Sequence, residues 1–189
     1  MRKLIVSMNL SLNGCMAGPD GGLQWHHNHW SEDMARAITQ QLADADTILL
    51  GRITYLAMAP HWRAGIGNGY GARQDMDFAD MMRSHTKVVV SGTLAAANCW
   101  PNTELINGDL ALAVAALKRQ PGKNIIVYGS GTLVDALARL DLVDEYRLWL
   151  HPVIIGLGRP LFSGLSASLQ FMARQVFDTG VVLLCYRPV

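Results

Sequence analysis

Two hydrophobic patterns alternate along this chain. Short apolar runs, such as 47–50 and 124–128, are typical of strands buried on both faces of a parallel sheet. Between these runs, apolar residues recur at helical spacing, as Met34, Ile38 and Leu42 do. The expected strands are 3–8, 47–50, 87–90, 124–128 and 145–150, and the expected helices lie around 34–45, 54–59, 76–84, 110–117 and 133–140. This alternation predicts an α/β fold with a mostly parallel sheet.

The end of the chain departs from this alternation. Two further apolar segments, 169–176 and 181–187, are separated by Asp178-Thr179-Gly180, which is typical of a turn. They predict a C-terminal β-hairpin, which would give the sheet an antiparallel edge. Earlier in the chain, Pro60 is expected to stop the helix that begins near Thr54, because proline lacks the N–H that a helix needs.

Two glycine-rich segments, 13–23 and 64–72, are predicted to be loops. The second contains Gly67, Gly69 and Ala72 at the spacing G-x-G-x-x-A, which also occurs in dinucleotide-binding turns. That spacing indicates binding only where it follows a strand. No strand precedes it here, so the segment is interpreted as a linker.

Glycines that directly follow a predicted strand point more clearly to a ligand. Gly129-Ser130-Gly131-Thr132 follows the strand 124–128 and begins a helix, where backbone N–H groups and the helix dipole favour an anion. The same residues would also suit a tight turn without a ligand. Gly51-Arg52 with Thr54, and Ser91-Gly92-Thr93, end two other strands in a similar way. Ligands bind at the carboxyl ends of strands in open α/β sheets, so these strand ends predict an anion-binding region.

Composition narrows the class of protein. The 189 residues suit a single domain, and 16 Lys+Arg against 15 Asp+Glu leave no basic excess for nucleic acid. No apolar stretch is long enough for a membrane span. Cys15, Cys99 and Cys185 lie far apart, which favours a reducing, cytoplasmic compartment. The histidines of 26–29 fit no standard metal spacing, so no metal is expected.

Several segments, taken in order, resemble the dihydrofolate-reductase-like superfamily, and above all its riboflavin-biosynthesis branch, the RibD C-terminal family. The segments that carry the resemblance are 11–14, 17–21, 50–55, 89–94, 127–131, 151–156 and 158–162. Each motif is short, but their ordered combination spans nearly the whole chain. The resemblance implies a three-layer α/β/α fold with a mixed, mostly parallel eight-stranded sheet, and it implies a homodimer.

The resemblance also implies an activity, namely hydride transfer from NADPH to a pyrimidine- or pterin-like heterocycle, as in 5-amino-6-(5-phosphoribosylamino)uracil reductase. The cofactor-binding residues that it carries over are Met16, Ala17, Gly51, Arg52, Thr54, Ser91, Gly92, Thr93, Gly129, Ser130, Gly131 and Thr132. The substrate would lie near Asn9, Asn13 and Trp25.

Two positions depart from the family pattern. Asn13 stands where the family usually has aspartate, and Gly92 stands where a basic residue is common, which weakens the expected preference for NADPH over NADH. Asp33 lies roughly where the folate-reducing branch has its acid, so it is a hypothetical catalytic residue. The favoured interpretation of Asp33, however, is a helix N-terminal acid stabilised by the dipole. A dihydropterin reductase, and a nucleotide-binding module without turnover, are the alternative functions.

Overall fold

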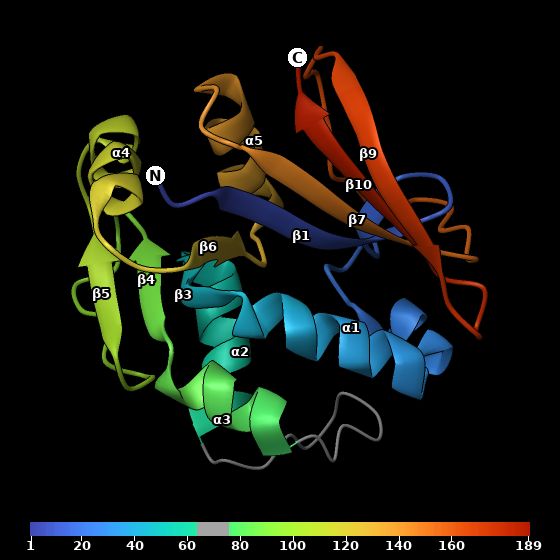
Figure 1. Ribbon diagram of the computed structural model, residues 1–189, viewed down its shortest axis with the longest axis horizontal. Helices are drawn as coiled ribbons and strands as arrows, with labels where there is room; N and C mark the ends of the chain where they lie inside the picture. The colour runs from blue at the N-terminus through green and yellow to red at the C-terminus, as the bar shows by residue number, and fades with distance from the viewer. Residues whose placement is uncertain (64–75) are drawn as a thin grey trace.

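The computed structural model describes residues 1–63 and 76–189. Its main strands are β1 (Leu4–Ser11), β3 (Ala45–Gly51), β4 (Thr86–Val90), β5 (Thr103–Ile106), β6 (Asn124–Val127), β7 (Glu145–His151), β9 (Leu169–Val176) and β10 (Val182–Pro188). They form one eight-stranded sheet in the order β5-β4-β3-β6-β1-β7-β10-β9 (Figure 1). The strands from β5 to β7 are parallel, and β10 and β9 are antiparallel to their neighbours. The predicted mixed sheet and C-terminal hairpin are thereby confirmed.

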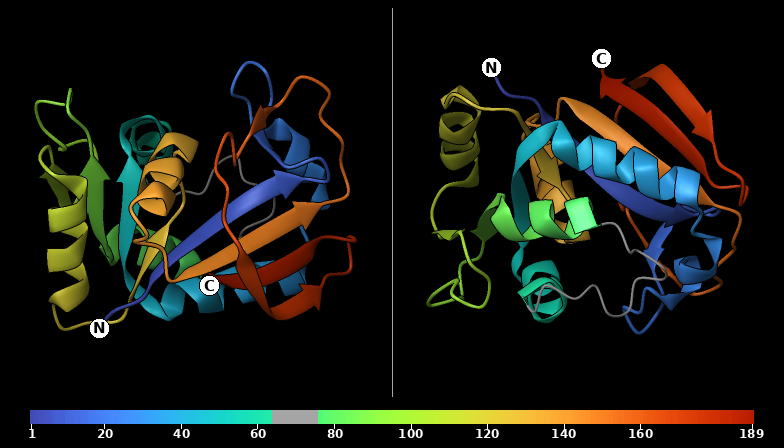
Figure 2. Two further views of the ribbon diagram at one scale, coloured as in Figure 1. Left: turned by 90° about the horizontal axis from the view of Figure 1, so that it is seen from above. Right: turned by 60° about the horizontal axis from the view of Figure 1, so that its bottom comes forward.

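Helices cover both faces of this sheet (Figure 2). They are α1 (Glu32–Ala43), α2 (Arg52–Arg63) and α3 (Met76–Ser84) on one face, and α4 (Leu110–Arg119) and α5 (Gly131–Arg139) on the other. Side chains alternate along a strand, so a central strand feeds both layers. In β3, Ile48 and Leu50 pack with α1, α2 and α3, whereas Leu49 packs with α4 and α5. The continuous apolar runs are explained by these two cores.

The loops that follow β1 and β7 contain more structure than their composition indicates. Residues 13–23 were expected to form a loop, but β2 (Cys15–Ala17) lies within them and pairs with β8 (Arg159–Pro160). A 3-10 helix, η1 (Gln24–His29), follows. The β2–β8 pair joins segments that are far apart in sequence, which is why local composition did not predict it.

The prediction that Pro60 stops a helix is wrong, because α2 continues through Pro60 to Arg63. The last turn is held by packing: Trp62 is buried, and its ring lies 5.4 Å from that of Phe78 in α3. Tertiary burial of a large aromatic side chain therefore outweighs the local cost of proline. The strand β5 was also not predicted, because it is short and only partly buried.

The predicted linker, with Gly67, Gly69 and Ala72, lies outside the described residues. Within the described part of the chain, every helix is too short or too polar to cross a bilayer.

Candidate active site

Three predicted strand ends meet at one edge of the sheet, because β4, β3 and β6 are adjacent and parallel. The backbone N–H of Gly51 donates to the carbonyl oxygen of Gly129 at 2.9 Å, which ties the ends of β3 and β6 together. A Cβ atom at Gly51 would lie 2.5 Å from Ser130 Oγ, so only glycine allows this approach. The Gly129–Ser130 peptide bond is cis.

The N-terminus of α5 begins at this junction. Ser130 is the N-cap residue, but its side chain makes no capping hydrogen bond. The first-turn amide groups of a helix have no partner within the helix, so those of α5 keep their capacity to donate. Gly131 has no side chain to cover them, and an added Cβ would lie 2.3 Å from Met16 Cε. The turn thus fits the close approach of an anionic group.

A cavity of about 320 Å³ opens beside this turn, between β1, β2 and the layer of α1, α2 and α3. Its volume is in the range of small-molecule sites. Of the residues predicted to bind cofactor or substrate, those that line it are Asn9, Met16, Ala17, Thr54, Gly129, Ser130, Gly131 and Thr132. Apolar side chains such as Met58, Phe78 and Met82 complete the wall.

The other predicted cofactor residues, Gly51, Arg52, Ser91, Gly92 and Thr93, do not line the cavity. Arg52 is exposed at the start of α2. Ser91 Oγ accepts hydrogen bonds from the backbone N–H groups of Thr93 and Leu94, at 3.2 and 2.9 Å, and so shapes the turn after β4. Gly92 is exposed, and an added Cβ would meet nothing within 4 Å.

Asn13 connects two loops and does not line the cavity. Its Oδ1 accepts from the Ile155 N–H at 3.0 Å, and its Nδ2 donates to the Ile155 carbonyl at 2.7 Å. An aspartate could not make the second bond, because a carboxylate has no proton to donate. The departure from the family's aspartate is therefore explained by a structural role between the segments that carry β2 and β8.

Asp33 also lies outside the cavity lining. Its carboxylate accepts hydrogen bonds from the Ser31 hydroxyl, from the Met34 N–H at 2.8 Å and from the Asp178 N–H at 3.2 Å. These bonds, the Ser31 hydroxyl first among them, lower the pKa of Asp33 although burial acts against them. The carboxylate therefore holds the start of α1 against the C-terminal hairpin.

Trp25 lies behind the cavity wall. Its ring packs edge-on against those of His26 and His151, at centroid distances of 5.2 and 5.4 Å. His26 lines the cavity and is buried, and its Nδ1 accepts from Trp30 Nε1–H at 3.3 Å. No three His, Cys, Asp or Glu side chains of the described residues are grouped so that they could hold a metal ion.

Sequence reasoning missed four polar residues of this site: Ser7, His26, His151 and Arg159. Ser7, His26 and Arg159 line the cavity, and the buried His151 supports Asn9 from the neighbouring strand. The β2–β8 pair brings Arg159 to the mouth, where its Nη2 donates to the Pro19 carbonyl at 3.2 Å. The one local signal for these residues was the alternation of Ser7 and Asn9, which places both side chains on one face of β1.

The charge of the lining is one-sided. Among the described residues that line the cavity, none carries a carboxyl group, whereas Arg159 is a cation. The lining thus favours neutral or anionic ligands over cationic ones.

Comparison with known proteins agrees with this architecture. The model of the RibD C-terminal domain matches residues 2–183, so the chain belongs to that family. The chain is 31% identical to the uncharacterized protein YyaP of Bacillus subtilis, over 98% of this chain and 94% of YyaP.

Two solved structures share the fold. One is the diaminohydroxyphosphoribosylaminopyrimidine deaminase/5-amino-6-(5-phosphoribosylamino)uracil reductase of Thermotoga maritima, with a TM-score of 0.70 and 16% identity over 100% of this chain and 57% of that one. The other is dihydrofolate reductase from Enterococcus faecalis in complex with NADP(H) and RAB-propyl, with a TM-score of 0.64 and 12% identity over 98% of this chain and 96% of that one.

Proposed function

We propose that this protein is an NADPH-dependent reductase of a pyrimidine-type heterocycle, similar in activity to 5-amino-6-(5-phosphoribosylamino)uracil reductase. One observation carries the proposal: a single cavity joins the glycine-rich turn at the start of α5 to the polar face of β1. Such a cavity can hold a phosphate-bearing cofactor on one side and a small heterocycle on the other. Membership of a family of reductases supports this assignment.

The residues of the turn fit a dinucleotide. The uncapped amides of α5 and the close glycine contacts would hold its phosphates, and Arg52 and Thr54 flank them on α2. Met16 and Ala17 would cover the ring that donates the hydride. The cofactor supplies the hydride when bound, and the chain's own residues bind and orient the substrate in a largely apolar cavity that excludes water.

The lining favours a pyrimidine over a dihydropterin. A protonated or amino-rich pterin ring needs a carboxylate partner, and Asp33 was the candidate for that role. Its carboxylate is occupied by Ser31, Met34 and Asp178, and no described lining residue replaces it. Arg159 at the mouth suits an anionic substituent on the substrate.

Titration of the purified protein with NADPH and with NADH, followed by nicotinamide fluorescence, tests the cofactor. Saturable NADPH binding, followed by oxidation of NADPH with an aminopyrimidine substrate, is the expected result. Failure of both nucleotides to bind would overturn the proposal. Tight binding without turnover of any pyrimidine or pterin would favour a nucleotide-binding module.

We also propose that the protein forms a homodimer through the hairpin of β9 and β10. The edge strand β9 exposes Phe171, Met172 and Val176, and an apolar edge strand that is left uncovered favours association. Sedimentation equilibrium of the wild type and of Val176→Lys would test this. A monomeric wild type at micromolar concentration would contradict it.

A further inference from the structure

Two polar residues of β1, Ser7 and Asn9, line the cavity, and each contacts a β7 side chain two residues beyond its register partner. The two strands lie side by side in the sheet (Figure 1). They are parallel, with Asn9 beside Trp149 and Ser11 beside His151. Trp149 Nε1–H donates to Ser7 Oγ at 3.0 Å, and His151 Nε2 lies 3.0 Å from Asn9 Oδ1. The contacts thus recur two residues apart along both strands, on one face of the sheet.

At Ser7, the acceptor capacity of the hydroxyl is used up. Its oxygen accepts from Trp149 Nε1–H and also from Gln41 Nε2–H, at 2.7 Å. A hydroxyl oxygen has two lone pairs, so the group can offer a cavity ligand only its O–H. If the Gln41 amide were turned the other way, a buried N–H would be left without an acceptor. Buried N–H groups without a partner are rarer in proteins than buried oxygens without one, such as Gln41 Oε1 in this structure.

At Asn9, the direction of the hydrogen bond follows from the burial of His151. Burial, together with the neighbouring His29, lowers the pKa of His151 to about 4, so its ring is neutral and carries one N–H. His151 is fully buried, and its Nδ1 has no hydrogen-bond partner among the described residues. A proton on Nδ1 would be an orphaned donor, so the proton belongs on Nε2.

His151 therefore donates to Asn9 Oδ1 and fixes the orientation of the amide. The Asn9 amide nitrogen, which donates to no described residue, is left for the cavity. The lone pair on His151 Nδ1 is buried without a hydrogen-bond partner, which costs stability. A histidine with a purely structural role would have no reason to bear this cost. The need to hold the Asn9 amide in one orientation accounts for it.

We propose that Ser7 and Asn9 form a recognition pair that presents hydrogen-bond donors to the cavity, and that it selects a carbonyl-bearing edge of the substrate ring and rejects an amino-bearing edge. His151 is the positioning residue of the pair, and Asn9 is the residue that contacts the ring. This inference rests on the proposed function for the presence of a heterocycle in the cavity. It adds which edge of that ring faces β1.

Two matched compounds test the proposal. 5,6-Diaminouracil carries two ring carbonyls, and 2,4,5,6-tetraaminopyrimidine carries amino groups at the same two positions. Isothermal titration calorimetry with each compound, with and without saturating NADP⁺, gives the ratio of their dissociation constants. The wild type is expected to prefer the diaminouracil by about tenfold or more, because an amino edge leaves the protein's donors unpaired.

Asn9→Asp should reverse the preference, moving the ratio by about a hundredfold, because its free oxygen accepts where the amide donated. Asn107→Asp, at an exposed position after β5, is the matched control and should leave the ratio unchanged. His151→Phe, which cannot donate, should reduce the preference to below about threefold. His151→Gln, which can donate to Asn9, should restore it.

Equal binding of the two compounds by the wild type, a ratio unmoved by Asn9→Asp, or no binding of either compound would overturn the inference. Its failure can be told apart from failure of the proposed function, because the NADPH titration is a separate measurement. If the protein discriminates between the two compounds but does not bind NADPH, the proposed reductase function is wrong and the recognition pair stands. If it binds NADPH but does not discriminate, the recognition pair is wrong and the proposed function stands.

Discussion

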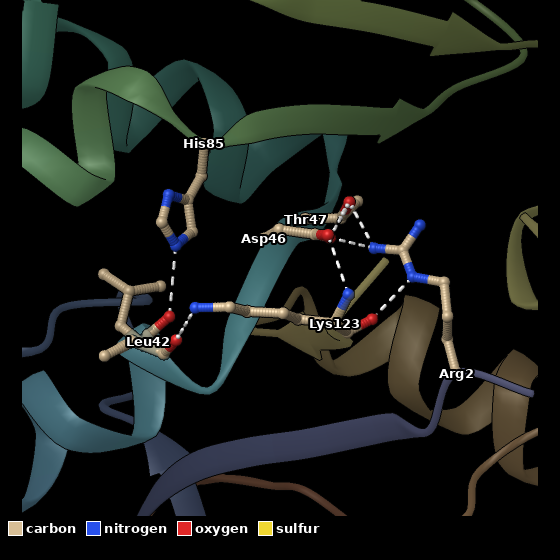
Figure 3. A network of polar contacts seen from close by, with 7 residues as sticks. Arg2, Leu42, Asp46, Thr47, His85 and Lys123 are labelled. Carbon is tan, nitrogen blue, oxygen red and sulfur yellow. Dashed lines mark hydrogen bonds and ion pairs between the residues drawn. The ribbon is translucent and has the colours of Figure 1, made fainter. Parts of the chain in front are cut away.

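The two edges of the parallel sheet differ in how their polar groups are paired. At the amino edge, Arg2 donates to Asp46, to Thr47 Oγ1 at 2.6 Å and to the Lys123 carbonyl at 2.6 Å (Figure 3). The Lys123 N–H in turn donates to Asp46 Oδ2 at 2.8 Å, and Lys123 Nζ donates to the Ala43 carbonyl at 2.8 Å. At the carboxyl edge, the α5 amides and the Asn9 amide nitrogen have no side-chain partner among the described residues.

The electrostatics of the amino edge agree with a structural role. Burial alone would raise the pKa of Asp46, but hydrogen bonds from Lys123 and Thr47, with the charge of Arg2, hold it below its ordinary value. A network that satisfies its own charges stabilises the fold and has little left to offer a ligand. At the carboxyl edge, hydrogen-bond donors without a protein partner remain available to a ligand. A ligand that accepts from them gains more binding energy there than at the amino edge.

The largest expected effect concerns Lys87, which lies near the amino edge and is buried with no acidic partner among the described residues. Burial lowers its pKa to about 8, whereas the unfolded chain keeps the ordinary value of 10.5. The unfolded state therefore binds more protons between these values, and stability should rise by about 3 kcal/mol as the pH rises from 8 to 10.5. Urea unfolding at several pH values should show this rise in the wild type, not in Lys87→Met. The exposed Lys3→Met serves as control and should keep it.

Breaking the amino-edge network should affect stability alone. Asp46→Ala removes the partner of the buried Arg2 and should lower the free energy of unfolding by about 2 kcal/mol. The dissociation constant for NADPH should stay within about twofold, since the network lies at the opposite edge. Asp80→Ala, which breaks an exposed ion pair with Arg83, should cost less than about 0.5 kcal/mol. A large loss of NADPH affinity in Asp46→Ala would contradict the separation of the two edges.

Breaking the carboxyl edge should affect binding first. In Gly51→Ala the new methyl group must displace Ser130, at a cost of about 1 to 3 kcal/mol. Because Ser130 begins α5, NADPH affinity measured by fluorescence should fall by about tenfold or more. Gly108→Ala, where an added Cβ meets nothing within 4 Å, is the matched control. An unchanged affinity in Gly51→Ala would remove this turn from the cofactor site.

The smallest expected effect is a gain. Gly92→Arg restores a cation at an exposed position with free space around it. It should raise the ratio of NADPH to NADH affinity by about fivefold, and high salt should abolish the gain. Gly92→Gln, which has no charge, should leave the ratio where it is. If Arg and Gln behave alike, the 2′-phosphate does not lie near this turn.

Local pattern predicted much of the carboxyl edge. The strands 47–50 and 124–128 and the glycines after them follow from rules that act over a few residues, and the structure brings Gly51 and Gly129 into direct contact. Local pattern was weaker where side chains meet across the sequence. It could not tell whether the Asp33 carboxylate faces a ligand or the backbone of Asp178, because Asp178 lies 145 residues away.

The sequence by itself determined the alternation of strands and helices, the glycines at the strand ends and the family, because periodicity and ordered motifs are local features of the chain. Only the tertiary structure decided which polar atoms are left for a ligand. Asn9 and His151 are 142 residues apart, and it is the register of β1 against β7 that brings His151 Nε2 within 3.0 Å of Asn9 Oδ1. The donor character of the cavity therefore arises from packing between distant strands, which no local rule contains.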